Sequence, residues 1–252
     1  MFVRNTLKIA LALVFLIPMS GAHAQTDNIF ALPEKTIDDI QTKAWRANPK
    51  FEAMARHALS NYPTNMDWVS FRRTYTQTRQ YDPDGIETIE KLHKIAFTLD
   101  TTQDPDEYQA QLRAYQNLVI NHMAHLGVVM ELAALAESHK RYGDPKFFNW
   151  LKRGIIRTVI NSGTGYTLDD AYDVITLHEE EMIFRYIRHI VQETVPNREV
   201  SIYYNMHTTQ NVDTGKTYTI FVNTTLPMKF LEAKDKARTK FIEDLNKSLG
   251  FN

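Results

Sequence analysis

Residues Asn161 to Arg185 read NSGTGYTLDDAYDVITLHEEEMIFR. This stretch opens with a turn that contains Gly163 and Gly165, and it ends in a segment that begins a helix with three consecutive glutamates. Paired glycines permit backbone conformations that other residues avoid, and acidic residues in a first helical turn complement the helix dipole. The stretch therefore predicts a loop between two well-formed helices. Its paired glycines and consecutive glutamates are unusual for a segment that only supports the fold.

Thr176 and Glu179 match the capping-box pattern, in which the threonine hydroxyl and the glutamate carboxylate bond to free N–H groups of the first turn. Two interpretations of Glu179 are open. It is either a cap at the edge of the core, or a carboxylate in a recess, tuned for acid–base or metal chemistry. The cap explains the pattern by itself, and it predicts that Glu179→Gln costs no more than about 1 kcal/mol of stability.

Helical periodicity predicts that this helix continues beyond Arg185. Its expected inward face consists of Ile183, Tyr186, Ile187, Ile190 and Val191. The expected outer face carries His178, Glu181, Arg185 and His189, which invites interpretation as a metal site. However, Met182 stands where a metalloprotease helix of the HExxH type needs histidine, and Arg185 places a cation in the row. An ion-paired, solvated face is the better interpretation, so we predict neither a metal nor a cofactor.

Upstream of this stretch, apolar residues at helical spacing predict helices at about 36–46, 50–60, 66–81, 86–99 and 145–161, with another starting at 104. Residues Leu118 to Ala136 are apolar around the whole helix, which predicts one continuous helix at the centre of the core. It contains His122 and His125. We expect these to be hydrogen-bonded core histidines, with a pair of ligands as the alternative.

Beyond Glu193 the apolar residues alternate with a period of two. Asp213-Thr214-Gly215 supplies a hairpin turn, so we predict a β-hairpin at about 199–225 and a charged helix from Lys229 to Leu249. Helix pairs joined by tight turns resemble the tetratricopeptide type. The predicted fold class is α+β, mainly α, with a helical-hairpin body, a C-terminal β-hairpin and a terminal helix, all in one domain at 36–252.

Residues 1–24 have the pattern of a secretory signal: two basic residues, an apolar run, and Ala22-His23-Ala24 as the cleavage site. The run is shorter than the roughly 20 residues of a membrane-spanning helix. We therefore predict a periplasmic or secreted protein that is not embedded in a membrane, with a polar tether at 25–35. Without Arg4 and Lys8, 27 basic side chains face 30 acidic ones, a formal charge of −3 that argues against binding nucleic acid.

The chain contains no cysteine. Disulfides, thiolate zinc sites and cysteine nucleophiles are therefore excluded. Stability has to come from the core.

Four segments, taken together, resemble a family of exported bacterial proteins known only as a domain of unknown function. They are FRRTYTQTRQYDPDG at 71–85, NHMAHLGVVMELAALAESHKRYGD at 121–144, GIIRTVINSGTGYTLDDAYDVITLHEEEMIFR at 154–185 and TGKTYTIFVNTTLP at 214–227. The resemblance implies a shared fold and export. It implies no activity, because none is established for the family.

The functional prediction is a non-catalytic exported interaction module that binds an unidentified envelope or extracellular protein. Loops on rigid scaffolds are where binding concentrates, although a purely connecting loop is an equal alternative. The candidate binding residues are Tyr166, Asp169, Asp170, Tyr172, Asp173 and Glu179. The alternative function is an envelope-acting hydrolase that uses Glu179 with a histidine such as His125, or with a bound metal.

Overall fold

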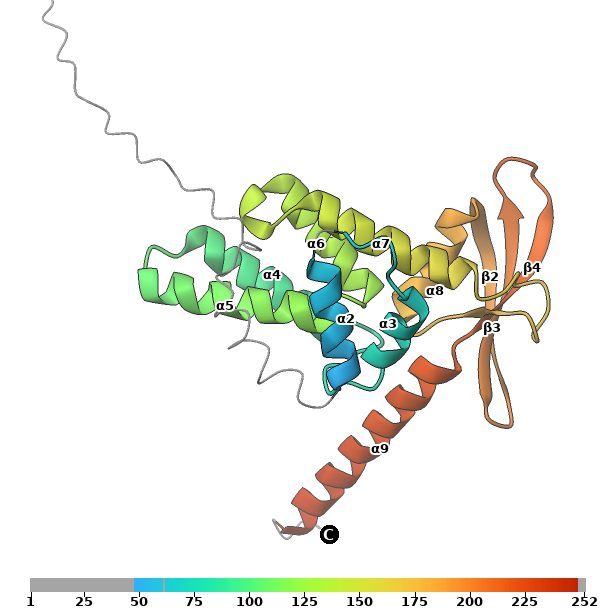
Figure 1. Cartoon of the computed structure of the whole chain (residues 1–252). Helices are drawn as coiled ribbons and strands as arrows, with labels where there is room; N and C mark the ends of the chain where they lie inside the picture. Colours follow the sequence, from blue (N-terminus) through green and yellow to red (C-terminus); the bar gives the residue numbers. More distant parts are fainter. Residues whose placement is uncertain (1–47, 61, 249–252) are drawn as a thin grey trace, which may run out of the picture.

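The computed structural model describes residues 48–60 and 62–248 (Figure 1). The expected signal peptide, tether and helix at 36–46 lie outside these residues. The elements are α2 (Pro49–Leu59), α3 (Trp68–Tyr75), α4 (Ile86–Thr101), α5 (Pro105–His122), α6 (Leu126–Ser138), the 3-10 helix η1 (Lys140–Tyr142), α7 (Pro145–Ile160), β1 (Tyr172–Asp173), α8 (Leu177–Tyr186), β2 (His189–Glu199), β3 (Ile202–Asn211), β4 (Thr217–Asn223) and α9 (Thr225–Ser248). The predicted class, α+β and mainly α, is confirmed.

The helical body contains two packed helix pairs, α4 with α5 and α6 with α7. Local sequence accounts for where these helices begin. Asp104 and Asp144 each precede a proline, and each carboxylate accepts a hydrogen bond of 2.9 Å from a first-turn backbone N–H. Proline at the first helical position loses no bond, because that N–H has no partner within the helix. Aspartate followed by proline therefore starts both α5 and α7.

The central apolar segment is two helices, so the prediction of one continuous helix from 118 to 136 is wrong. The chain turns at Met123 to His125, and His125 Nδ1 accepts a hydrogen bond of 3.2 Å from the N–H of Val128 at the start of α6. The end of α5 and most of α6 are buried. When apolar residues surround a helix on all sides, their pattern does not show where the chain changes direction. Histidine is not a usual capping residue, so it did not mark the start of a new helix either.

The helix expected at 66–81 is also shorter than predicted, because α3 ends at Tyr75. After it, the hydroxyls of Thr76 and Thr78 each donate a 2.8 Å bond to a backbone carbonyl three residues earlier. Such local bonds compete with helix continuation. The chain then turns inward, so that Tyr81 is buried and its hydroxyl donates to the Ile175 carbonyl at 2.6 Å.

The strands form one sheet in the order β1-β4-β3-β2. β1 pairs with β4 in parallel, with Tyr172 opposite Val222, and the other pairs are antiparallel. The sheet packs on α8 and on the end of α7 through a second apolar cluster, separate from the core of the helical body. Its buried members are Val159, Tyr172, Val174, Ile183, Phe184, Ile220 and Val222.

Strand β2 corrects the prediction that the α8 helix continues through Ile190 and Val191. The helix ends at Tyr186, and Arg188 has a left-handed φ of 59°, which no α-helix accommodates. The next residues pair with β3 from His189 onward. The predicted hairpin at about 199–225 is confirmed by β3 and β4, which begin at Ile202 and end at Asn223.

The C-terminal helix α9 starts beside β3 and then extends away from the helical body (Figure 1). Its first turns contact the body: Phe230 packs edge-on against Tyr81 at 4.8 Å, and Lys234 lies 3.6 Å from Glu87. Among the helices of the described ranges, none has the length and apolar character required to cross a membrane.

Candidate functional site

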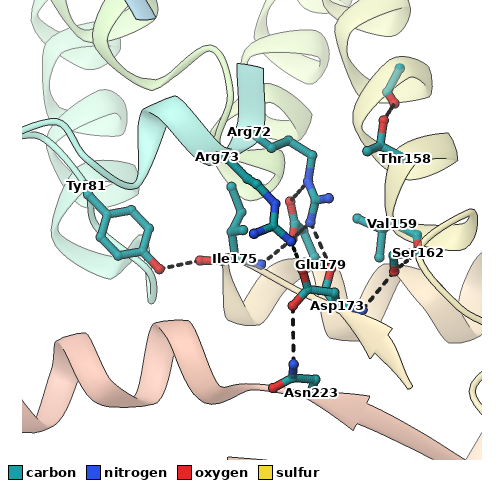
Figure 2. Close-up of polar contacts among 11 residues, drawn as sticks. Arg72, Arg73, Tyr81, Thr158, Val159, Ser162, Asp173, Ile175, Glu179 and Asn223 are labelled. Carbon is teal, nitrogen blue, oxygen red and sulfur yellow. Dashed lines mark hydrogen bonds and ion pairs between the residues drawn. The ribbon is translucent and has the colours of Figure 1, made fainter. Parts of the chain in front are cut away.

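Glu179 lies at the junction between α3, α8 and the sheet, where it forms a buried ion pair with Arg72 (Figure 2). Arg72 Nε donates to Glu179 Oε1 at 3.0 Å, and Arg72 Nη2 donates to Oε2 at 2.6 Å. The backbone N–H of Ile175 donates to the same Oε2 at 2.7 Å. Neither side chain of the pair is more than 5% exposed. The carboxylate is thus held by three charge-assisted bonds away from water.

The capping-box prediction for Glu179 is wrong. The carboxylate bonds to the N–H of Ile175 instead of that of Thr176, and the Thr176 hydroxyl is buried with no partner in the described chain. The reason is the guanidinium of Arg72, 107 residues away in sequence, whose fork binds a carboxylate in two places. The recess interpretation is correct about burial. However, the oxygens of Glu179 are already engaged, which leaves little capacity for acid–base or metal chemistry.

Three histidines lie behind this junction. His122 Nδ1 is 3.1 Å from the Tyr75 hydroxyl, and the ring of His178 packs 5.4 Å from that of His125. Burial lowers the pKa of His122 to about 4 and that of His125 to about 3. The prediction that His122 and His125 are hydrogen-bonded core side chains is confirmed. Because His125 is fully buried, it cannot meet a substrate at the surface.

The row of His178, Glu181, Arg185 and His189 does not exist as one helix face. His189 belongs to β2, where its Nδ1 lies 2.8 Å from the Thr209 hydroxyl. Glu181 pairs with Arg185 on the surface of α8, as predicted. Among residues 48–60 and 62–248, no three histidine or acidic side chains are grouped to hold a metal ion.

The loop at 163–173 is bound tightly to the sheet. The N–H of Gly165 donates to the Asp170 carbonyl at 2.8 Å, and the Gly165 carbonyl accepts from the N–H of Phe221 in β4 at 2.7 Å. The Asp170 carboxylate folds back onto the hydroxyl of Thr164. Tyr172 is only 6% exposed and joins the sheet cluster. The loop is therefore a preorganised segment, as the connector interpretation requires.

We expect Gly165→Ala to destabilise the protein by about 2–5 kcal/mol in urea unfolding. Gly165 has a φ of +75°, and an added Cβ would lie 2.6 Å from the Tyr172 ring, so backbone strain of roughly 1–2 kcal/mol adds to overpacking of about 1–3 kcal/mol. Gly215→Ala is the matched control, because its φ of +68° is similar but its Cβ would meet nothing within 4 Å. Equal losses for the two variants would show that the loop is not packed as described.

Asp173 is the point where the loop meets α3. Its Oδ2 accepts from Arg73 Nη2 at 2.9 Å, its carbonyl accepts from Arg72 Nη2 at 3.0 Å, and its Oδ1 lies 3.4 Å from the amide nitrogen of Asn223 (Figure 2). The predicted binding residues therefore divide into three groups. Tyr166 and Asp169 are exposed, the exposed Asp170 and the half-buried Asp173 bond within the fold, and the buried Tyr172 and Glu179 cannot contact a partner.

A cavity of about 530 Å³ lies between α3 and α7 at the base of this loop. Its walls carry three arginines from two helices, Arg72 and Arg73 on α3 and Arg157 on α7. The remaining lining residues are Met66, Asp67, Trp68, Val69, Thr158, Asn161, Ser162 and Asp173.

Some side-chain N–H groups of the arginines in this cavity have no hydrogen-bond acceptor within the described chain. Among the described residues, the side chain of Arg157 forms no hydrogen bond or ion pair, and Arg72 Nη1 donates to no acceptor. The two acidic lining residues are engaged elsewhere: Asp173 pairs with Arg73, and Asp67 caps α3 by accepting from the N–H of Ser70 at 3.0 Å, a bond that lowers its pKa. The cavity thus presents N–H donors that lack acceptors, next to the exposed apolar side chain of Val69.

None of these arginines was among the predicted site residues. A signal for Arg72 exists in the sequence, because it lies four residues after Trp68 and three before Tyr75, on the apolar face of α3. A cation on an inward face requires a buried partner. No comparable signal marks Arg157, since exposed arginines near a helix C-terminus are ordinary.

No protein-family model, curated protein or solved structure matches this chain.

Proposed function

We propose that this protein is an exported binding module whose α3–α7 cavity takes an acidic, carboxylate-bearing segment of a partner protein. One observation carries the proposal: the cavity is lined by three arginines, of which Arg157 and the Nη1 group of Arg72 lack any acceptor among the described residues. Donors at a concave surface that are not satisfied internally are suited to an incoming acceptor.

The chemistry of these side chains favours a carboxylate. A guanidinium presents N–H groups in a planar fork that matches the two oxygens of a carboxylate. Trp68 and Val69 add an apolar wall, which suits an aliphatic residue beside the acidic one. The cavity is also preorganised, because Asp173 ties α3 to the sheet and Trp68 packs at 4.7 Å from Trp150 on α7. Preorganisation reduces the entropic cost of binding.

The alternative hydrolase based on Glu179 receives no such support. Glu179 is fully buried and bonded to Arg72 and Ile175, and His125 is fully buried as well. A general base has to come within hydrogen-bond reach of a substrate proton, which neither residue can do from these positions.

Export belongs to the proposal too, and it rests on the pattern of residues 1–24. Intact-mass analysis of the protein recovered from the periplasm or the medium is expected to give a chain that begins at Gln25.

Peptide binding tests the cavity directly. We expect a fluorescein-labelled peptide with glutamates on both sides of a leucine to bind by fluorescence anisotropy, and its glutamine counterpart to bind at least about tenfold more weakly. Arg157→Glu is expected to weaken binding of the acidic peptide by about tenfold or more, because it places a like charge opposite the carboxylates. Affinity should also fall with added salt, since exposed charges are screened.

Arg153→Glu is the matched control, because Arg153 is exposed on the same helix but does not line the cavity. Equal affinity for the two peptides, or equal loss in the two charge reversals, would contradict the proposal. A Tyr166→Ala variant separates the cavity from the exposed tip of the loop. A loss there as large as that in Arg157→Glu would move the site to the tip.

A further inference from the structure

A second cavity, of about 400 Å³, lies between α8 and strands β2 and β3. It contains none of the residues of the α3–α7 cavity. Three apolar side chains line this cavity, those of Leu177, Phe184 and Val191. Arg185 also lines it and carries a positive charge. The other lining residues are Glu180, Glu181, His189, Thr194, Asn205 and His207.

Three of these side chains form a continuous hydrogen-bonded chain. The Thr194 hydroxyl lies 2.9 Å from His207 Nδ1, and His207 Nε2 lies 2.6 Å from Glu180 Oε1. The Asn205 amide donates to the same Glu180 oxygen at 2.7 Å. The hydroxyl is at the open end of the chain: Thr194 is exposed, whereas the side chains of His207 and Glu180 are only 4% and 14% exposed.

The fold places these groups by strand register. Thr194 and His207 are direct partners across the β2–β3 pair, and Glu180 lies in the first turn of α8 beneath the sheet. The pairing shifts between Val191 and Glu193, so one extra residue of β2 is accommodated there. A bulge reverses the alternation of side chains. It explains why Val191 before the shift and Thr194 after it both line the cavity.

The order of groups matches that of a nucleophile, a base and a carboxylate that orients the base. With the imidazole proton on Nε2, His207 donates to Glu180, and Nδ1 is left to accept the proton of the Thr194 hydroxyl. The carboxylate favours this tautomer because it can only accept. The hydroxyl at the open end of the chain is then the group that faces the cavity.

We propose that Thr194 is the nucleophile of an acyl-transfer site for small esters with an apolar acyl group. Thr194 Oγ1 attacks the ester carbonyl carbon while its proton passes to His207 Nδ1. The carbon–oxygen bond to the alcohol breaks, and the leaving oxygen takes that proton. His207 then removes a proton from water, and the water oxygen attacks the carbonyl carbon of the acyl-threonine. The bond from that carbon to Thr194 Oγ1 breaks, Oγ1 takes the proton back from His207, and the carboxylic acid leaves. Thr194 and His207 are the catalytic residues, and Glu180 is a positioning residue.

The walls of the cavity set the substrate class. Leu177, Phe184 and Val191 offer an apolar surface to the acyl chain. The guanidinium of Arg185 is paired with Glu181 through Nη2, and its remaining N–H groups are the cationic donors that would stabilise the oxyanion. A cavity of about 400 Å³ is at the small end of the range for ligand sites. These features favour a short acyl group over a polymer.

Hydrolysis of p-nitrophenyl butyrate by the full-length protein tests the site. We expect Thr194→Ala to lower kcat/KM by about 100-fold or more, and Thr194→Ser to retain activity within about tenfold because it keeps the hydroxyl. A fluorophosphonate probe is expected to form an adduct on Thr194, located by peptide mass spectrometry. Thr219→Ala is the matched control, because Thr219 is exposed on β4 and does not line the cavity.

Glu180→Gln distinguishes a role of Glu180 in orienting His207 from a role in keeping the protein folded. If Glu180 orients His207, its loss is expected to lower kcat/KM per folded protein, and Glu180→Asp, which keeps the carboxylate, is expected to retain more activity than Glu180→Gln. A merely structural role would lower the folded fraction and leave the activity per folded protein unchanged. Thr194→Ala with wild-type activity, an adduct confined to other residues, or a wild-type protein with neither activity nor adduct would each overturn the proposal. Thr194→Ala is expected to leave peptide binding intact, so this outcome is independent of the binding function.

Discussion

Glu179→Ala is expected to lower the free energy of unfolding by about 3–5 kcal/mol, the range for breaking a buried ion pair on one side. The substitution leaves the guanidinium of Arg72 only 5% exposed and without its carboxylate. It also removes the acceptor of the Ile175 N–H. Urea unfolding monitored by tryptophan fluorescence measures this loss.

The milder Glu179→Gln variant distinguishes a helix-capping role of Glu179 from its role in the buried ion pair with Arg72. A capping role predicts a loss of no more than about 1 kcal/mol, whereas the buried pair predicts clearly more, since an amide cannot neutralise Arg72. Glu181→Ala is the matched control: Glu181 lies two residues further along α8, and its ion pair with Arg185 is more than half exposed. A loss below about 1 kcal/mol is expected there.

A double variant tests whether the effect belongs to the pair. Arg72→Met combined with Glu179→Leu removes both charges, and we expect it to be more stable than either single variant, because no unpaired charge remains buried. If Glu179→Gln costs as little as Glu181→Ala, or if the single losses simply add, the buried pair does not have the role described.

Acidification from pH 7 to pH 4 is expected to destabilise the protein by several kcal/mol. In the unfolded chain a histidine takes up a proton near its ordinary pKa of about 6.5. Burial lowers the pKa of His125 to about 3 and that of His122, which also faces Lys91, to about 4. The folded state therefore binds fewer protons across this range, so stability is complete above about pH 6.5 and declines as the pH falls. His125 alone accounts for about 3 kcal/mol at pH 4.

The measurement is the urea midpoint at pH 7, 6, 5 and 4. His125→Asn is expected to flatten the pH dependence, because asparagine can still cap α6 but does not titrate. His93→Asn is the matched control, since His93 is more than half exposed and its partner is Glu131. An unchanged slope in His125→Asn would show that carboxylates alone cause the acid sensitivity. His178, whose ring contacts His125, is the other imidazole on this side of the core.

The ion pair of Glu179 and Arg72 bears on the proposed binding cavity. Arg72 bonds to Glu179 and to the carbonyl of Asp173, so the same side chain supports α8 and shapes the cavity wall. We therefore expect Glu179→Gln to weaken binding of the acidic peptide as well as stability. The cavity and the ion pair are two consequences of one arrangement of α3 against the loop.

Local chemistry in the sequence determined much of the framework. Aspartate followed by proline predicted the starts of α5 and α7, because each bond of the cap joins residues two positions apart. The turn at Asp213 to Gly215 predicted the β3–β4 hairpin for the same reason, since Gly215 adopts a φ of +68° within the turn. The alternation of side chains in these strands needed no knowledge of what they pack against.

The tertiary structure decided the features for which local sequence preferences favour more than one conformation or favour none. Ile190 and Val191 fit the apolar face of a helix, but they form a strand because β3 supplies hydrogen-bond partners along it. Glu179 has the sequence pattern of a cap, yet Arg72, 107 residues away, binds it twice. Arg157 and Thr194 look ordinary in sequence, and they become candidate site residues through the cavities around them. Interactions between residues near in sequence are encoded in short patterns, whereas partners brought together by folding depend on the whole chain.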